Sequence, residues 1–237
     1  MHISQLELED MHVHSTFSDG RDSILDNVCQ ARRLGLRRLT CVDHVRKDSR
    51  FVPDFVKEVR RVQAETSLEL FVGVEAKILD GYGQLDVPSD LSGVDYIYAA
   101  DHQLPMGTGC YKPIDIRRQL ADGTLGAAEV VLALVDATLA VLFRYPRIVL
   151  AHLFSVLPKV GLDENLVPLR LLGELAEAAR AAGAAIEVDE RWECPGPRTL
   201  RIFHRAGVPI FLSTDSHAKG TIGAYRYATE TMRQVLG

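Results

Sequence analysis

Short apolar runs alternate with longer segments of helical period along most of the chain. The runs are rich in Val, Ile and Leu, which is typical of parallel strands covered on both faces. Strands that alternate with helices predict an α/β fold. We expect seven strands, at residues 11–14, 38–42, 68–74, 96–100, 148–151, 184–188 and 208–212. Seven such units favour a distorted (β/α)7 barrel similar to a TIM barrel, although a doubly wound sheet fits the same pattern.

Helical periodicity fills the gaps between these strands. A first helix is expected from an N-cap at Asp22 or Ser23 to about Arg33, with Gly35 in the stop position. Further helices are expected at residues 51–65, 127–144, 166–182 and 197–205. The helix at 127–144 is strongly apolar, which fits either a helix packed on the barrel or part of an oligomer interface.

The stretch from residue 103 to 126 fits no regular element, because Pro105, Gly107, Gly109 and Pro113 interrupt it. Long segments without regular structure in compact domains are often functional, so we predict a lid loop here. The chain shows no internal repeat, low-complexity tract or linker. We therefore expect one domain over residues 1–237.

Composition and charge restrict the class of protein. The 237 residues, of which 47% are hydrophobic, are enough for one α/β barrel of roughly 200–250 residues. The formal net charge of −5 makes nucleic acid a less favoured partner. The four cysteines form no Cys-x-x-Cys pair, which disfavours a zinc finger. The N-terminal sequence resembles no signal peptide and no run of about 18 apolar residues occurs, so we expect a cytoplasmic protein that does not bind membranes.

Metal-binding residue types recur at the ends of the predicted strands. His12 and His14 stand at alternate positions of the first strand, so their side chains point the same way. Asp215 and His217 repeat this spacing after the last strand. Five more candidates lie between these pairs, namely Asp19, His44, Glu75, His102 and His152. In a parallel barrel all carboxyl ends of strands open onto one face, where active sites are built.

A single buried histidine is more often a hydrogen-bonded core residue than a metal ligand. Here six of the eight histidines fall on one predicted face, which packing alone does not explain. The other two, His2 and His204, do not fit the pattern and receive no role. A set of nitrogen and oxygen ligands without thiolate suits zinc, manganese or iron. Nine candidates exceed what one tetrahedral ion uses, so we expect two or three divalent ions, with Glu75 able to bridge two of them. Clustered ions of this kind suit hydrolysis.

These residues resemble the PHP family, named for polymerase and histidinol phosphatase. The resemblance covers nearly the whole chain and is carried by MHVHSTFSDG, VDH at 42–44, GVE at 73–75, ADH at 100–102, AH at 151–152, IEV at 186–188 and STDSH at 213–217. It implies a distorted barrel of seven β/α units and a trinuclear metal centre. Asp19 stands where members vary between aspartate and histidine. The segment before His102 reads YIYAAD, where many members have a glycine-serine pair.

The resemblance also implies a division of ligands among three ions. The first would take His12, His14, Glu75 and Asp215. The second would share Glu75 and add His102 and His152. The third would take Asp19, His44 and His217.

The activity implied is hydrolysis of phosphate esters by a metal-activated hydroxide that attacks phosphorus in line. Glu75, Asp215 and His217 would be catalytic through the metal centre, together with Arg191, which directly follows the sixth strand. Planar guanidinium groups match phosphate geometry, so Arg191 is the first choice to bind the substrate phosphate. Further choices, each as compatible with a surface charge, are Lys219 and then Arg117 with its neighbour Arg118.

Three functions remain open on sequence grounds. The first is a phosphatase that hydrolyses a small phosphate monoester, with histidinol phosphate the best-known family substrate. The second is a phosphodiesterase or exonuclease acting on nucleotides or nucleic acid, which the modest aromatic content and negative charge disfavour. The third is a non-catalytic, metal-stabilised module for protein interaction. An oligomer is compatible with the apolar helix.

Overall fold

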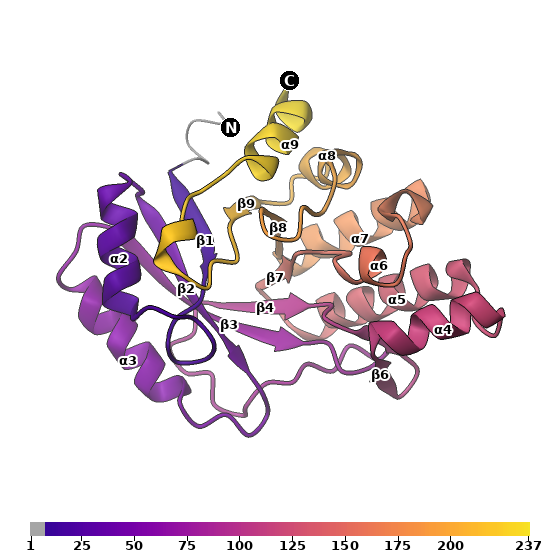
Figure 1. The fold of residues 1–237 in the computed structure, drawn as a ribbon, viewed down its shortest axis with the longest axis horizontal. Helices are drawn as coiled ribbons and strands as arrows, with labels where there is room; N and C mark the ends of the chain where they lie inside the picture. Colours follow the sequence, from indigo (N-terminus) through magenta and orange to yellow (C-terminus); the bar gives the residue numbers. More distant parts are fainter. Residues whose placement is uncertain (1–7) are drawn as a thin grey trace.

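Seven parallel strands form one sheet that curls into a nearly closed barrel (Figure 1). The computed structural model describes residues 8–237, so His2 lies outside the described part. The strands follow one another around the barrel as β1 (Glu9–Val13), β2 (Arg38–Val45), β3 (Glu69–Lys77), β4 (Tyr96–Ala100), β7 (Ile148–Ala151), β8 (Ala185–Asp189) and β9 (Ile210–Ser213). All seven predicted strands are confirmed, with ends that shift by up to three residues. The barrel, and not a doubly wound sheet, is correct.

The barrel closes where β1 meets the segment after β9. A single parallel bridge joins Val13 to Ser216. The main-chain N–H of His14 donates to the carbonyl of Ser216 at 2.8 Å, and the N–H of Ser216 donates to the carbonyl of His12 at 3.2 Å. The hydrogen bonds that complete the barrel therefore involve His12 and His14, which were predicted to bind metal.

Two buried carboxylates extend this seam toward the start of β1. Glu9 accepts the main-chain N–H of Leu212 at 3.3 Å, and Asp10 accepts the N–H of Thr214 at 3.0 Å. Both acidic side chains lie almost wholly out of solvent. Side-chain acceptors thus satisfy donors that a regular strand ladder would otherwise satisfy.

Helices cover the outside of the barrel, with α2 and α3 on one side and α5 and α7 on the other (Figure 1). They are α2 (Ile24–Arg33), α3 (Val52–Gln63), α4 (Pro113–Asp122), α5 (Ala127–Arg144), α6 (Val156–Lys159), α7 (Leu169–Ala182), α8 (Pro197–Arg205) and α9 (Tyr227–Leu236), with short 3-10 turns η1 (Glu164–Leu166) and η2 (Lys219–Thr221). Ser23 caps α2, because its hydroxyl accepts the N–H of Asp26 at 3.1 Å. Gly35 follows α2 at φ +77°, as its stop position requires.

The segment at 103–126 corrects one expectation. It contains a two-stranded hairpin, β5 (Leu104–Met106) and β6 (Gly109–Tyr111), followed by α4. Gly107 supplies the positive φ of +57° that the tight turn needs. Pro113 is the first residue of α4, a position whose N–H would have no partner within the helix, so proline loses no hydrogen bond there. Leu104 and Ile116 are fully buried. The prolines and glycines of this segment therefore mark the ends of short elements and do not exclude regular structure. That the segment closes as a lid stays a prediction.

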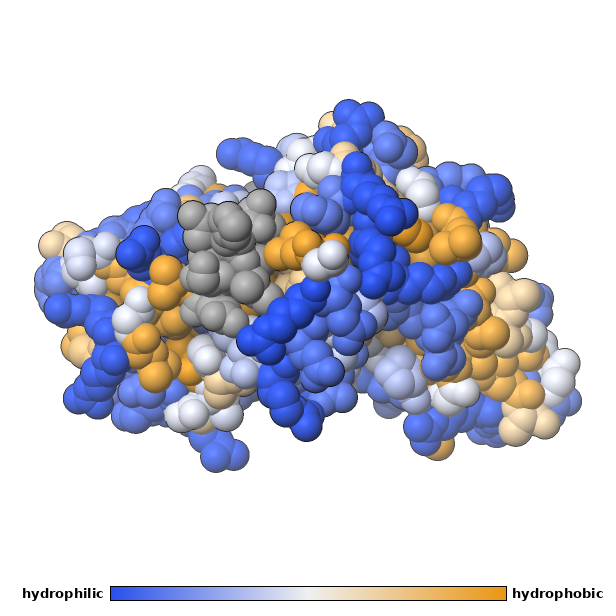
Figure 2. Space-filling model, turned by 90° about the horizontal axis from the view of Figure 1, so that it is seen from above, coloured by the Kyte–Doolittle hydropathy of each residue, from blue (hydrophilic) through white to orange (hydrophobic). Residues whose placement is uncertain are grey.

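The face seen in Figure 2 is mostly hydrophilic, with separate hydrophobic patches among charged residues. The predicted apolar helix is α5, which buries one side against the barrel and leaves Leu132 and Phe143 exposed. Within residues 8–237, no helix is both long enough and apolar enough to cross a bilayer.

Candidate metal centre

All nine predicted ligands meet at the carboxyl ends of the barrel strands. His12 and His14 come from the end of β1, His44 and Glu75 from β2 and β3, and the others from the loops that follow strands. Three carboxylates contact the six imidazoles, each through several pairs. The carboxylates are Glu75, Asp215 and Asp19.

Glu75 lies at the centre of the cluster. Its side chain is 1% exposed, and its two oxygens face different imidazoles. Oε1 lies 3.1 Å from Nε2 of His102 and 3.0 Å from Nε2 of His152. Oε2 lies 2.9 Å from Nδ1 of His44 and 3.4 Å from Nε2 of His14. A carboxylate so placed has the geometry to bridge two cations.

His12 and His14 converge as alternate residues of a strand should. Their Nε2 atoms lie 3.1 Å apart, and Nε2 of His14 lies 3.0 Å from Oδ1 of Asp215. Two nitrogens bound to one tetrahedral zinc at about 2.0–2.1 Å would be separated by roughly 3.3 Å. The spacing of these atoms therefore suits a shared ion.

Strained backbone at two strand ends directs ligands inward. His152 has φ +31° and Asp215 has φ +47°, a region that residues other than glycine rarely occupy. Such strain is maintained when the surrounding contacts fix it, and it is concentrated at functional sites. The Oδ2 atom of Asp215 accepts the indole N–H of Trp192 at 2.8 Å, which fixes this carboxylate from the side away from His14.

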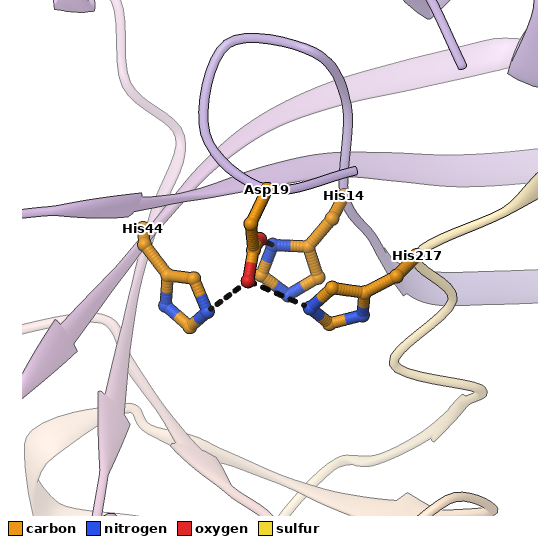
Figure 3. Close-up of side chains that lie close together, drawn as sticks. All are labelled: His14, Asp19, His44 and His217. Atoms are coloured by element: carbon orange, nitrogen blue, oxygen red, sulfur yellow. Dashed lines mark ion pairs between the residues drawn. The ribbon is translucent and has the colours of Figure 1, made fainter. Parts of the chain in front are cut away.

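Asp19 lies among the imidazoles of His14, His44 and His217 (Figure 3). Its Oδ2 is 3.6 Å from Nε2 of His44 and 3.3 Å from Nε2 of His217, and its Oδ1 is 3.6 Å from Nδ1 of His14. The Asp19 side chain is 53% exposed. It is therefore the most accessible of the three carboxylates.

Asp43 holds the loop that carries Asp19. This buried carboxylate accepts the main-chain N–H groups of Ser15 and Ser18, each at 3.1 Å, and the hydroxyl groups of both serines. Gly20 allows the loop to fold back, because a Cβ there would lie 2.6 Å from the main chain of His14. Asp43 was part of the VDH motif, but its role was not evident from sequence.

Burial and neighbouring charges set the protonation of the cluster. Burial alone would raise the pKa of Glu75, but the surrounding imidazoles, His102 foremost, hold it well below its ordinary range. Burial lowers the pKa of His14 to about 4. Glu75 and His14 are thus in the forms that bind metal. Burial would also lower the pKa of His12 and His152, but neighbouring carboxylates hold it well above its ordinary value, so these two imidazoles would lose a proton when metal binds.

A divalent cation fits the donor atoms. Buried atoms of the cluster, including Nδ1 of His14, Oε2 of Glu75 and Oδ1 of Asp215, make no hydrogen bond of suitable angle in the described part of the chain, although imidazole nitrogens lie close to both oxygens. Buried polar atoms without partners are uncommon unless an ion or water satisfies them. Groups whose ligand atoms lie within 4.8 Å of one another are His14, Asp19, His44 and His217; His12, His14 and Asp215; His44, Glu75 and His102; and His12, Glu187 and Asp189.

Glu187 is a residue that the sequence reasoning missed. It lies 3.0 Å from Nδ1 of His12 and accepts the main-chain N–H of His152 at 2.6 Å. Asp101 has a related place, 3.6 Å from Nδ1 of His152. Carboxylates that hold the far nitrogen of a ligand imidazole fix its orientation. The IEV and ADH motifs contained both residues, and this was the only signal available.

The structure separates the predicted phosphate-binding cations. Arg191 reaches the cluster, with Nη1 3.2 Å from Oδ2 of Asp215 and 2.6 Å from Nδ1 of His217. Lys219 instead pairs with Asp22 at 3.2 Å, on the loop before α2. Its nearness to His217 in sequence therefore does not bring its ammonium to the cluster.

Arg117 and Arg118 lie exposed on α4, where Arg118 pairs with Asp115. A different cation, Lys159, approaches the cluster. Its Nζ lies 3.7 Å above the ring of Trp192, and burial lowers its pKa. Sequence gave no reason to select Lys159, because it follows His152 by seven residues on a short helix.

Known proteins share this fold and sequence pattern. A probable phosphatase of Clostridium acetobutylicum is 25% identical over 226 residues, which cover 92% of this chain and 82% of that protein. The structure of histidinol phosphate phosphatase from Lactococcus lactis, complexed with zinc, L-histidinol and phosphate, superposes with a TM-score of 0.68. It is 21% identical and the match covers 96% of this chain and 92% of that one, which shows a shared fold. Residues 10–152 match the PHP domain. The chain belongs to the PHP domain family.

Proposed function

We propose that this protein is a divalent-metal-dependent phosphatase that hydrolyses small-molecule phosphate monoesters. The observation that carries the proposal is the convergence of ligand atoms around Glu75, whose two oxygens face separate imidazoles in a buried cluster. Divalent ions in such a cluster lower the pKa of water and neutralise charge on phosphoryl oxygens. Relatives with phosphatase names support this reaction class.

We assign the ligands in the division that the motifs imply. One ion takes His12, His14, Glu75 and Asp215; a second takes Glu75, His102 and His152; a third takes Asp19, His44 and His217. The grouping of ligand atoms supports each set in part. It also adds His14 to the third set. His152 belongs to none of these groups of ligand atoms, so its assignment to the second ion rests on its contact with Glu75. We expect zinc, manganese or iron at these positions.

Side chains around the cluster orient the ligands and the phosphoryl group. Glu187 fixes the imidazole of His12, and Trp192 fixes Asp215, so that these ligands keep one orientation as charge develops. We assign the phosphoryl contact first to Arg191, since its guanidinium lies against Asp215 and His217 and its side chain is 46% exposed. Lys159 is our second choice. We assign no phosphate contact to Lys219, because Asp22 and Asp26 already hold its ammonium.

The test is phosphate release by protein whose metal content has been measured after loading with zinc or manganese. The substrates are monoesters that include histidinol phosphate and 4-nitrophenyl phosphate, and a diester, bis(4-nitrophenyl) phosphate. Asp215→Ala should lower kcat/KM on monoesters by roughly 100-fold or more. The matched control is Asp136→Ala, an exposed aspartate on α5.

Each other outcome favours another function. Faster cleavage of the diester than of any monoester would indicate a phosphodiesterase. Absence of turnover on every ester with metal bound, together with a lower melting temperature for Asp215→Ala, would indicate a non-catalytic module.

A further inference from the structure

A cavity of about 770 Å³ opens beside the candidate metal centre. One wall consists of predicted ligands, among them His44, Glu75 and His102. The remaining wall contains residues that the ligand assignment does not use, and some of them, such as Arg46 and Lys77, also lie outside the motifs. Cavities of this size hold small metabolites, so the part of the substrate beyond its phosphoryl group has room here.

Lys77 extends from the strand that carries Glu75. The two residues are alternate positions of β3, so their side chains leave the strand on the same face. Lys77 lines the cavity and is partly buried. Its Nζ lies 3.5 Å from Oε1 of Gln103, and within residues 8–237 no carboxylate lies within 4.0 Å of it. A partly buried ammonium without an anionic partner is a favourable site for an anion.

The other charges that line the cavity reinforce this preference. Arg46 adds a second cation. Apart from the candidate ligands, Asp86 is the one carboxylate on the lining, and one of its oxygens already accepts the main-chain N–H of Lys47 at 2.8 Å. With Asp19 and Glu75 neutralised by bound metal ions, the two cations face one partly satisfied carboxylate. An ammonium on the substrate would meet repulsion here, whereas a carboxylate or phosphate would gain attraction.

We infer that this cavity holds the leaving-group half of the substrate and that Lys77 binds a second anionic group on it. The substrate class is then a phosphorylated small molecule with a carboxylate or another phosphate, and not a phosphorylated amine. The inference rests on the proposed phosphatase activity. Lys77 acts as a specificity residue, because its charge selects among leaving groups, whereas Arg191 and the metal centre act on the phosphoryl group.

Binding of non-hydrolysable phosphonates tests the inference directly. Calorimetry with zinc-loaded protein would compare propylphosphonate, which has a neutral tail, with 3-phosphonopropanoate, propane-1,3-diphosphonate and 3-aminopropylphosphonate. We expect one or both of the anionic tails to bind about tenfold more tightly than the neutral tail, and the cationic tail to bind most weakly. The two anionic compounds distinguish a carboxylate from a second phosphate.

Variants identify the residue responsible. Lys77→Met should remove the preference for an anionic tail and leave propylphosphonate binding within about threefold. Lys77→Arg should keep the preference, and Lys57→Met, at an exposed lysine of α3, should behave as wild type. Should Lys77→Met fail to fold by circular dichroism, Lys77→Gln replaces it, and the wild-type comparison stands on its own.

Hydrolysis separates failure of this inference from failure of the proposed function. The matched esters are 3-phosphoglycerate and glycerol 3-phosphate, in which a carboxylate of the first replaces a hydroxymethyl group of the second. Release of phosphate from both at equal kcat/KM, or an anionic preference that persists in Lys77→Met, overturns the role of Lys77 and leaves the phosphatase intact. Release from neither, with no phosphonate bound, overturns both.

Discussion

Replacement of Asp43 tests whether the loop around Asp19 is held in place by a single buried side chain. Asp43→Ala removes the acceptor for four donors on Ser15 and Ser18. The two hydroxyl groups can turn to other partners, whereas the main-chain N–H of Ser15 cannot. Asp43→Asn is the matched control, because its carbonyl oxygen can still accept the N–H groups.

The loss of stability expected for Asp43→Ala follows from the burial of the two serines. Ser15 is fully buried, and its N–H has no acceptor besides Asp43 among the described residues, so losing that bond costs about 1–3 kcal/mol. Ser18 is partly exposed and its N–H also faces the carbonyl of Ser15 at 3.2 Å, so its loss adds less. We expect Asp43→Ala to lower the free energy of unfolding by about 2–4 kcal/mol. The loosened loop should also weaken metal binding at Asp19 by roughly 10–100-fold.

Two assays measure these effects separately. Denaturant unfolding of metal-free protein reports stability, and competition with a chromogenic chelator reports metal affinity. Asp43→Asn should recover most of the stability. If Asp43→Ala unfolds within about 0.5 kcal/mol of wild type and binds every ion as tightly, the loop does not depend on Asp43 and the reasoning is wrong.

Three other predictions concern pH, metal and the indole. Burial raises the pKa of Glu9 from 4.5 to about 7, so between these values the folded protein holds a proton that the unfolded chain has released. The free energy of unfolding of metal-free protein should therefore fall by up to about 3 kcal/mol as pH rises from about 4.5 to 7. Denaturation at several pH values should show a flatter slope for Glu9→Gln, and equal slopes for the two proteins would reject the assignment to Glu9. Chelation of divalent ions should lower Tm and zinc should restore it, because ions at ~1,000 times their Kd add about 4 kcal/mol, and a Tm that ignores chelator would argue against bound ions. Trp192→Phe removes the hydrogen bond to Asp215 and should lower kcat/KM by roughly five- to tenfold with little loss of Tm, whereas unchanged kinetics would show that the indole N–H does not orient the carboxylate.

The predictable part of this structure was the part governed by periodicity. Strands and helices follow from alternating apolar runs, and the rule that parallel strand ends share one face brings nine distant residues together. His12 and His14 converge because alternate residues of a strand must do so. Strand ends shifted by a few residues without changing which side chains meet.

The remaining part depended on contacts that no local pattern contains. Glu187 lies 175 residues from its partner His12, and only the closed barrel brings them together. Lys219 stands beside His217 in sequence, yet acidic residues near the start of α2 attract its side chain. The hairpin at β5 and β6 has strands of three residues, which are too short to show alternation.

The seam between β1 and β9 has a consequence for how this protein is made. Hydrogen bonds of Ser216 with His12 and His14 join the end of β1 to a segment some two hundred residues later. During synthesis, most of the barrel can emerge from the ribosome while Asp215 and His217 are still missing. The nascent chain therefore presents only part of the ligand set until residue 217 has been translated. The full centre can therefore assemble only late, because only a chain translated past residue 217 brings all of these ligands together.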